Sequence, residues 1–204
     1  MTGILKVDQI QNNAGTTALE IGSNGELTIP ENASFAAGKG IAQNYYESTT
    51  LPSNGVWDLA IDQIPSWHTE IVLAFDQLSS NASSGIFYRV YDGSSIETTG
   101  YRQVSYYYNA GTPNVANRNN VDNGFVFYGW DNAANVMCGT IKFTRLPQNY
   151  YVVTGQAYNE GYRDYVIGLH GRQDSISNAG GITGLRIETA SGTFDSGRIR
   201  VYWR

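Results

Sequence analysis

The stretch VMCGTIKFTRLPQNYYVVTGQAY, residues 136–158, carries the pattern that decides the fold. It contains two strand candidates, residues 136–146 and 150–158, rich in β-branched and aromatic side chains. Pro147 lies between them, at the end of a run, where a missing backbone N–H interrupts no ladder. Cys138 alternates with Met137 in the first run, and we predict that it is a small, buried hydrophobic residue. The stretch therefore predicts antiparallel β-structure.

The same pattern extends outward over most of the chain. We predict further strands at residues 56–63, 70–78, 85–91, 101–108, 124–130, 164–170, 182–189 and 198–203. The segments between them, NAGTPN at residues 109–114 among them, are dominated by Gly, Asn, Asp and Ser and are predicted to be loops. All five prolines fall at the ends of runs or in loops, and no stretch has helical periodicity beyond a turn or two.

Many short strands without alternating helices predict two antiparallel sheets packed face to face. We therefore expect an all-β fold, a jelly-roll-like antiparallel β-sandwich over residues 44–204. An immunoglobulin-like sandwich has fewer strands and often a Cys, Trp, Cys pattern that this chain lacks. The 204-residue chain is 41% hydrophobic but only 15% charged, below the usual ~25%, and it contains 23 glycines.

Charge and cysteine content argue against several classes of partner and site. The formal net charge is −5 and Lys and Arg do not cluster, so we expect no nucleic-acid partner. One cysteine excludes an intrachain disulfide, and no Cys/His pair has ligand spacing, so we expect no metal and no cofactor. The first residues lack a signal-peptide pattern and no eighteen apolar residues run together. We therefore expect neither export by a signal peptide nor membrane insertion.

The first 43 residues are predicted to form a separate segment for attachment or oligomerisation, with residues 31–43 as a linker. Residues 4–10, ILKVDQI, alternate weakly, and TTALEIGSNGELTIP then places a hairpin turn at Asn24-Gly25. An isolated hairpin is at best marginally stable in water, so its apolar side chains must pack on something else. The attachment candidates are Leu5, Val7, Leu19, Ile21, Leu27 and Ile29.

Aromatic residues supply the candidate binding site. The chain contains 15 tyrosines and four tryptophans, some of them grouped near predicted strand ends, as at Tyr150-Tyr151. Amphipathic rings at such places can stack on a sugar or fill a subunit interface. The candidate glycan or receptor platform consists of Trp130, Tyr106, Tyr107 and Tyr108. Because strand side chains alternate, at least one of the three consecutive tyrosines must face away from the core. Packing in the core and between subunits is the alternative interpretation.

No catalytic residue is assigned, and we expect a protein that is not an enzyme. Carboxylates such as Asp58 and Asp62 are scattered, and the sequence cannot show whether two of them converge across a cleft. His68 and His170 are far apart and neither lies in a metal-binding or triad motif. Each is expected to be a hydrogen-bonded or a surface histidine.

Two segments resemble tail-fibre and other virion structural proteins of tailed bacteriophages, notably the marine type. GILKVDQIQNNAGTTALEIGSNGELTIP, residues 3–30, resembles their short N-terminal module. GITGLRIETASGTFDSGRIRVYW, residues 181–203, resembles the final strand pair of their C-terminal β-domain, and residues 71–101 look like the same domain type. The resemblance covers most of the chain and carries over no catalytic residues.

The resemblance implies a bacteriophage virion protein, and we expect a tail-fibre subunit that mediates host attachment by adhesion. It also implies a homotrimer whose partners are other tail or capsid proteins of the particle, with a host surface glycan as a further partner. Three alternatives stay open: an architectural head-fibre, capsid or decoration protein, a free carbohydrate-binding module, and a depolymerising enzyme.

Overall fold

The computed structural model describes residues 9–11, 17–21, 27–28, 44–48, 51–52, 54–59, 64–82, 85–109, 112–121, 124–127, 136–160 and 165–204. For residues 9–48, 107–109, 112–121, 160 and 165–166, where they are described, the description is confined to the backbone. The chain divides into two compact units, Met1–Ile41 and Ala42–Arg204.

The first unit contains a three-stranded sheet in the order β1-β2-β3. Its strands are β1 (Gln9–Gln11), β2 (Thr17–Ile21) and β3 (Leu27–Thr28). Strands β2 and β3 pair antiparallel, which is the pairing that the hairpin prediction required. Leu19, Ile21 and Leu27 lie in these strands, while Leu5, Val7, Ile29 and the Asn24-Gly25 turn lie outside the described residues. The attachment role of these residues stays a prediction.

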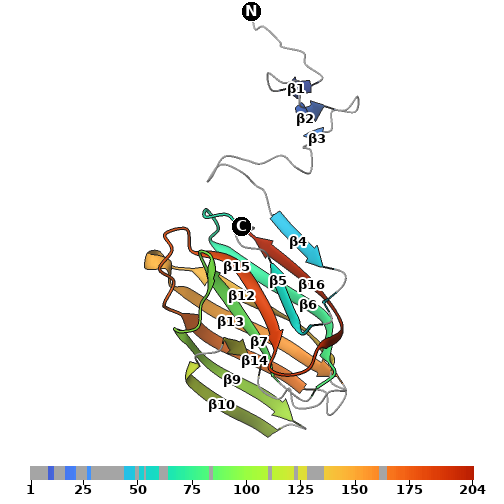
Figure 1. Cartoon of the computed structure of the whole chain (residues 1–204), viewed down its shortest axis with the longest axis vertical. Coiled ribbons are helices and arrows are strands. Elements are labelled where there is room, and N and C mark those ends of the chain that lie inside the picture. Colours follow the sequence, from blue (N-terminus) through green and yellow to red (C-terminus); the bar gives the residue numbers. More distant parts are fainter. Residues whose placement is uncertain are drawn as a thin grey trace, which may run out of the picture. The chain divides into compact units, whose positions relative to one another are not determined.

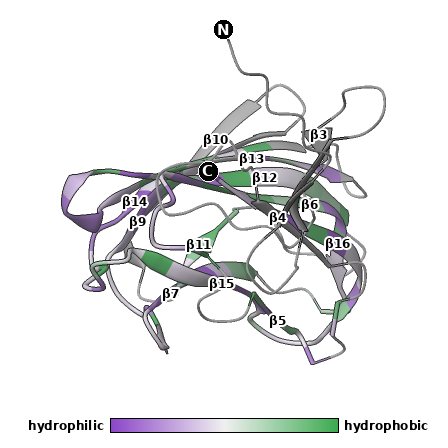
Figure 2. Cartoon of the chain, turned by 90° about the horizontal axis from the view of Figure 1, so that it is seen from above, coloured by the Kyte–Doolittle hydropathy of each residue, from purple (hydrophilic) through white to green (hydrophobic). Residues whose placement is uncertain are grey.

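The second unit consists of two stacked antiparallel sheets (Figures 1 and 2). The eight-stranded sheet has the order β10-β9-β14-β13-β12-β6-β16-β4. Its strands are β4 (Asn44–Ser48), β6 (Glu70–Ser80), β9 (Tyr101–Asn109), β10 (Thr112–Val121), β12 (Val136–Arg145), β13 (Tyr151–Glu160), β14 (Tyr165–Gln173) and β16 (Phe194–Trp203). This arrangement confirms the predicted all-β antiparallel sandwich.

The other layer is a five-stranded sheet in the order β11-β7-β15-β5, with β8 paired to β7. Its strands are β5 (Val56–Leu59), β7 (Ile86–Asp92), β8 (Ser95–Ile96), β11 (Phe125–Val126) and β15 (Ile182–Thr189). The chain crosses between the layers several times, because β5 and β7 lie in the smaller sheet while β6 lies in the larger one. The described residues contain no α-helix, only a 3₁₀ turn, η1 (Pro147–Asn149), between β12 and β13.

The core lies between the two sheets, where hydrophobic side chains from both layers meet. Phe75 of the larger sheet packs on Tyr88 and Phe127, with ring centroids 5.6 and 5.8 Å apart. Strand β12 shows the expected alternation, since Met137, Ile141 and Phe143 are buried while the residues between them are half-buried or exposed. Burial on one side of each strand therefore fixes which side chains the sheet presents outward.

Cys138 is half-buried on the outer side of β12, so its predicted burial is wrong. Met137 occupies the core position, and alternation turns the next side chain outward. The Cys138 thiol donates a 3.3 Å hydrogen bond to Asp76 and accepts one of 3.3 Å from the Gln77 backbone N–H. Gln77 has a positive φ of 51° at a register shift between β6 and β12, which places its N–H near the sulfur.

Three strands fall where no strand was predicted: β4, β8 and β10. The segment NAGTPN, predicted to be a loop, provides the end of β9 and the start of β10. Pro113 therefore lies inside a strand, opposite Tyr108. Strand β10 is the last strand of its sheet and pairs only with β9 within the described chain, so proline is tolerated there.

Candidate binding face of the eight-stranded sheet

The predicted aromatic platform is only partly described. Tyr106 is half-buried in β9 on the side of the sheet that faces away from the core. Its ring stacks on His170 of β14, with centroids 5.9 Å apart and planes 16° apart. The same ring lies over Gly168, so close that a Cβ at this position would collide with it. Intramolecular packing therefore already occupies part of this ring.

Tyr107 and Tyr108 lie in β9 opposite Ile167 and Val166 of β14, and only their backbones are described. Trp130 lies outside the described residues. The platform of Trp130 with Tyr106, Tyr107 and Tyr108 thus remains a prediction. The described side chains place the more open aromatic surface elsewhere on the same sheet.

Backbone register fixes which side chains are neighbours on the outward side of the eight-stranded sheet, here called the outer face. One row consists of Arg102, Arg172, Val152, Thr144, Glu70 and Arg204, the last of which directly follows β16. The next row consists of Val104, His170, Thr154, Lys142, Val72 and Tyr202. Since neighbouring strands lie about 4.8 Å apart, six strands give each row a length of roughly 24 Å.

Exposed apolar side chains gather on this face. Among the side chains that the structure describes, the large hydrophobic ones that are at least 40% exposed are Val104, Leu146, Tyr150, Val152 and Tyr158. Val104, Val152 and Tyr158 lie on the outer face, and Leu146 and Tyr150 flank the turn between β12 and β13. All five thus belong to the larger sheet or to its β12–β13 hairpin. Such a one-sided distribution is typical of a surface that contacts a partner.

A pocket opens at the corner where this hairpin meets the end of β14. It has a volume of about 460 Å³ and is lined by Leu146, Tyr150, Tyr151, Val152, Arg172 and Asp174; we call it the corner pocket. One side is apolar and aromatic, and the other carries a guanidinium and a carboxylate. Its size falls within the range of sites that bind small molecules.

The charged wall of the corner pocket consists of Arg172 and Asp174, and Arg102 lies beside it on the neighbouring strand. Arg102 of β9 and Arg172 of β14 lie directly opposite each other. Arg102 Nε is 3.2 Å and Arg172 Nη2 is 2.9 Å from the same oxygen, Oδ2 of Asp174. The arginine side chains are 52% and 54% exposed, against 15% for Asp174. The pair therefore presents guanidinium groups to the solvent at the rim of the pocket.

A second ion cluster lies farther across the outer face, where Lys142 of the second row joins Glu70 and Arg204 of the first. Lys142 Nζ and Arg204 Nη2 are 3.1 and 2.9 Å from the carboxylate of Glu70. Burial alone would raise the pKa of Glu70, but the hydrogen bonds and charges of Lys142 and Arg204 outweigh it and hold the pKa below its ordinary value. Two cations again share one carboxylate, so each of the two charge clusters carries an excess of one positive charge.

Hydrogen bonds of Arg145 stabilise the β12–β13 hairpin that borders the corner pocket. Its Nη1 donates to the Ser66 carbonyl at 2.7 Å, and its Nη2 donates to Asn149 Oδ1 at 2.6 Å and to the Ala179 carbonyl at 2.9 Å. One side chain thus ties the turn between β12 and β13 to two other loops. Arg145 therefore fixes the position of this turn, which borders the corner pocket.

Tyr151 also lines the corner pocket, and its hydroxyl is hydrogen-bonded to buried His68. The Tyr151 hydroxyl donates to His68 Nε2 at 2.8 Å and accepts the Ile182 N–H at 3.0 Å, while His68 Nδ1 donates to the Pro65 carbonyl at 2.8 Å. Burial lowers the pKa of His68, and the nearby charge of Arg145 lowers it further, against the raising effect of the Pro65 hydrogen bond. His68 is thus a neutral, hydrogen-bonded histidine, as expected, and His170 is exposed.

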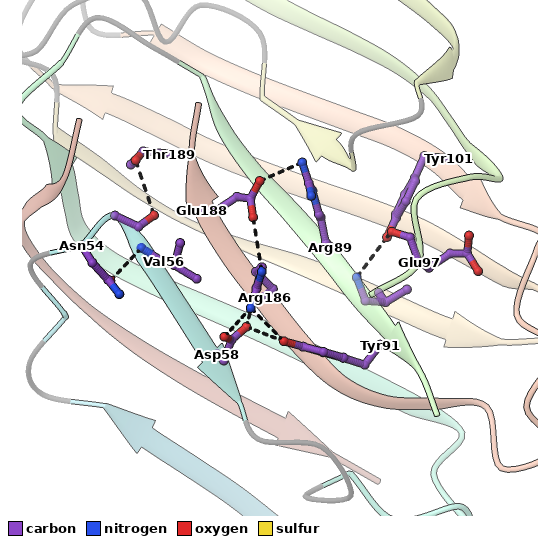
Figure 3. Close-up of polar contacts among 12 residues, drawn as sticks. Asn54, Val56, Asp58, Arg89, Tyr91, Glu97, Tyr101, Arg186, Glu188 and Thr189 are labelled. Atoms are coloured by element: carbon purple, nitrogen blue, oxygen red, sulfur yellow. Dashed lines mark hydrogen bonds and ion pairs between the residues drawn. The ribbon is translucent and has the colours of Figure 1, made fainter. Parts of the chain in front are cut away.

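The five-stranded sheet presents a different surface, in which the charges are paired within the molecule (Figure 3). Arg186 makes a two-pronged contact with Asp58, both bonds 2.7 Å long, and donates to the Tyr91 hydroxyl at 3.1 Å. Arg89 lies 2.7 Å from Glu188. Burial and the neighbouring Asp58 raise the pKa of Tyr91. Asp58 is therefore held in an ion pair, and Asp62 lies outside the described residues.

Most of the corner pocket was not predicted from the sequence. Tyr150 was noticed as one of a pair of tyrosines near a strand end, but Val152, Arg172 and Asp174 carry no motif. Strand pairing brings Val152 opposite Arg172, and Asp174 follows the end of β14. A signal existed in the outward positions of the strands, where Val104 and Val152 stand at positions that usually carry polar side chains.

In the described part of the chain, no three His, Cys, Asp or Glu side chains are grouped so as to hold a metal ion. The same part contains no helix with the length and apolar character required to cross a membrane. Comparison of the chain with protein-family models, with curated proteins and with solved structures gave no match.

Proposed function

We propose that this chain is a structural protein of a bacteriophage particle, a tail-fibre subunit that attaches the particle to its host by adhesion and catalyses no reaction. The resemblance of residues 3–30 and 181–203 to virion proteins supports the location in the virion. The observation that carries the adhesive role is the gathering of exposed apolar side chains, with the corner pocket, on the outer face.

A host surface glycan fits the chemistry of the corner pocket. A sugar ring has an apolar face, which can pack on the exposed ring of Tyr150 and on Val152. Its hydroxyl groups can donate to Asp174 and accept from Arg172 on the opposite wall. A single shallow site of this kind binds weakly, so several subunits acting together supply the adhesion through avidity.

Two tyrosines of equal exposure allow a matched test. Tyr150 lines the corner pocket and Tyr158 lies on the outer face away from it, and each is 42% exposed. The fluorescently labelled full chain is applied to an array of bacterial surface glycans. We expect the wild type and Tyr158→Ala to bind the same glycan and Tyr150→Ala to lose most of the signal. Equal binding by the two variants, or no glycan binding by the wild type, contradicts the proposal.

The first unit is proposed to join the subunit to the particle and to its own copies, in a homotrimer. The support is the size of this unit, since a three-stranded sheet of such short strands has little surface with which to form its own core. Sedimentation of the full chain is expected to give a trimer, and a chain lacking residues 1–41 is expected to stay folded but not to enter particles. A stable full-length monomer, or normal incorporation of the shortened chain, contradicts this assignment.

The nearest alternative is an architectural subunit of the head or tail, in which the outer face packs on a neighbouring protein. It is favoured by Val104 and Val152, which are aliphatic and lie on an open sheet. Under this alternative, Val104→Glu is expected to abolish assembly of the particle. If the chain instead acts by adhesion through the corner pocket, the same substitution is expected to leave assembly intact.

A further inference from the structure

Arg102 and Arg172 form an arrangement that the sandwich itself does not require. Like charges directly opposite each other on neighbouring strands destabilise a sheet. Here both guanidinium groups are drawn to one carboxylate oxygen, Oδ2 of Asp174, so the cluster keeps an excess of one positive charge. More than half of each arginine side chain is exposed. A second anion at this place would relieve the remaining repulsion.

The donors of this pair suit a carboxylate. A guanidinium carries five N–H donors in a planar fork that matches the two oxygens of a carboxylate. Arg172 contacts Asp174 through Nη2 and lines the corner pocket, and Arg102 contacts the same carboxylate through Nε. Each arginine therefore has further donors for a ligand at the rim, while Asp174 holds both heads in place.

The apolar wall narrows the class of anion. Leu146, Tyr150 and Val152 line the same pocket as Arg172. A nucleic acid requires a row of cations that follows its phosphates, whereas this pocket offers one guanidinium on its wall and a second beside it. A ligand that combines one carboxylate with an apolar ring face matches both walls at once.

We infer that the corner pocket binds a sugar acid, a glycan residue that carries a carboxylate. This inference rests on the proposed glycan-binding function and names the substrate class of that site. The carboxylate lies against Arg172, with Arg102 as the second donor, and the ring packs on Tyr150 and Val152. Through this contact the protein binds polysaccharides that contain sugar acids more tightly than neutral polysaccharides.

The probe is trigalacturonate, and its matched neutral control is the same trisaccharide with its carboxyl groups reduced. Affinities of the full chain are measured by calorimetry near 0.15 M salt, where the Debye length of about 8 Å suppresses diffuse attraction. Loss of one hydrogen bond to a charged group weakens binding by about tenfold or more. We therefore expect at least about tenfold weaker binding of the neutral trisaccharide, and a similar loss for Arg172→Gln with trigalacturonate.

Arg198→Gln is the control for charge. Arg198 is exposed on the same sheet, and it lines a different pocket of about 250 Å³ with Asp76 and Tyr202. This variant is expected to change the affinity less than about twofold, because it removes the same charge far from the proposed contact. Arg172→Lys keeps the charge but loses the planar fork, and we expect it to fall between wild type and Arg172→Gln.

Several results overturn the inference. Equal affinity for the acidic and the neutral trisaccharide would show that the carboxylate of the ligand makes no contribution. A loss of affinity in Arg198→Gln as large as that in Arg172→Gln would show that overall charge, and not a contact with Arg172, attracts the ligand. Stronger binding of dextran sulfate than of carboxymethyl dextran of equal charge density assigns the site to sulfate instead. In each case, glycan binding that is still weakened by Tyr150→Ala leaves the proposed function standing. Glycan binding that is unaffected by Tyr150→Ala contradicts both the proposed function and the sugar-acid inference.

Discussion

Replacing Tyr151 by Phe deletes one oxygen atom and thereby breaks two buried hydrogen bonds. The hydroxyl donates to His68 Nε2 and accepts the Ile182 N–H, and His68 and Ile182 are 1% and 0% exposed. A buried polar group left without a partner costs about 1–3 kcal/mol. With two such groups, we expect Tyr151→Phe to lower the free energy of unfolding by about 2–6 kcal/mol, a large part of the ~5–15 kcal/mol of a typical domain.

The neighbouring residue provides the control. Tyr150→Phe removes the same atom from a ring that is 42% exposed. Because water reaches this side chain, we expect removal of its hydroxyl to cost little stability. Urea unfolding of the full chain, followed by tryptophan fluorescence at pH 7.5, measures both variants. We expect Tyr150→Phe to stay within about 0.5 kcal/mol of wild type, with the same slope against urea for all three proteins. A Tyr151→Phe value inside that limit would refute the hydrogen-bonded chain from His68 to Ile182.

Two further predictions concern the same sheet and the same histidine. Because the pKa of His68 is lowered from 6.5 in the folded state, its contribution to stability is complete above pH 6.5 and is lost as the pH falls from there toward the folded pKa. We therefore expect the free energy of unfolding, measured with urea at pH 7.5, 6.5 and 5.5, to decrease as the pH falls. A free energy of unfolding that does not change over this range contradicts the lowered pKa of His68. Gly168→Ala places a methyl group against the ring of Tyr106, which must move away from His170 at a cost of about 1–3 kcal/mol; an unchanged melting temperature would show that the ring does not lie there.

Alternation and turn chemistry made the sandwich predictable because each strand carries its own signal. The strand predicted at residues 182–189 has the same bounds as β15, and the run from Val136 shows buried and outward residues in turn. Strand β10 gave no such signal, since TPNVANRNNV is rich in Asn and contains a proline. An edge strand can accept such a sequence because it needs hydrogen bonds on one side only.

The corner pocket was beyond prediction for a different reason. Its walls depend on register, which brings Val152 of β13 opposite Arg172 of β14 and Arg172 opposite Arg102 of β9. A shift by one residue would turn these side chains inward, and local sequence does not fix the register of such pairs. Tyr150 alone could be singled out, as an aromatic residue beside a turn.

Pro113 in β10 also affects whether two copies of the chain can pair through the edges of their larger sheets. The outermost strand of an open sheet exposes a row of backbone donors and acceptors to which a similar strand from another molecule could add. Proline offers no amide hydrogen, so this row is interrupted near the start of β10. Copies of the chain at high local concentration are thereby discouraged from pairing edge to edge into a continuous sheet.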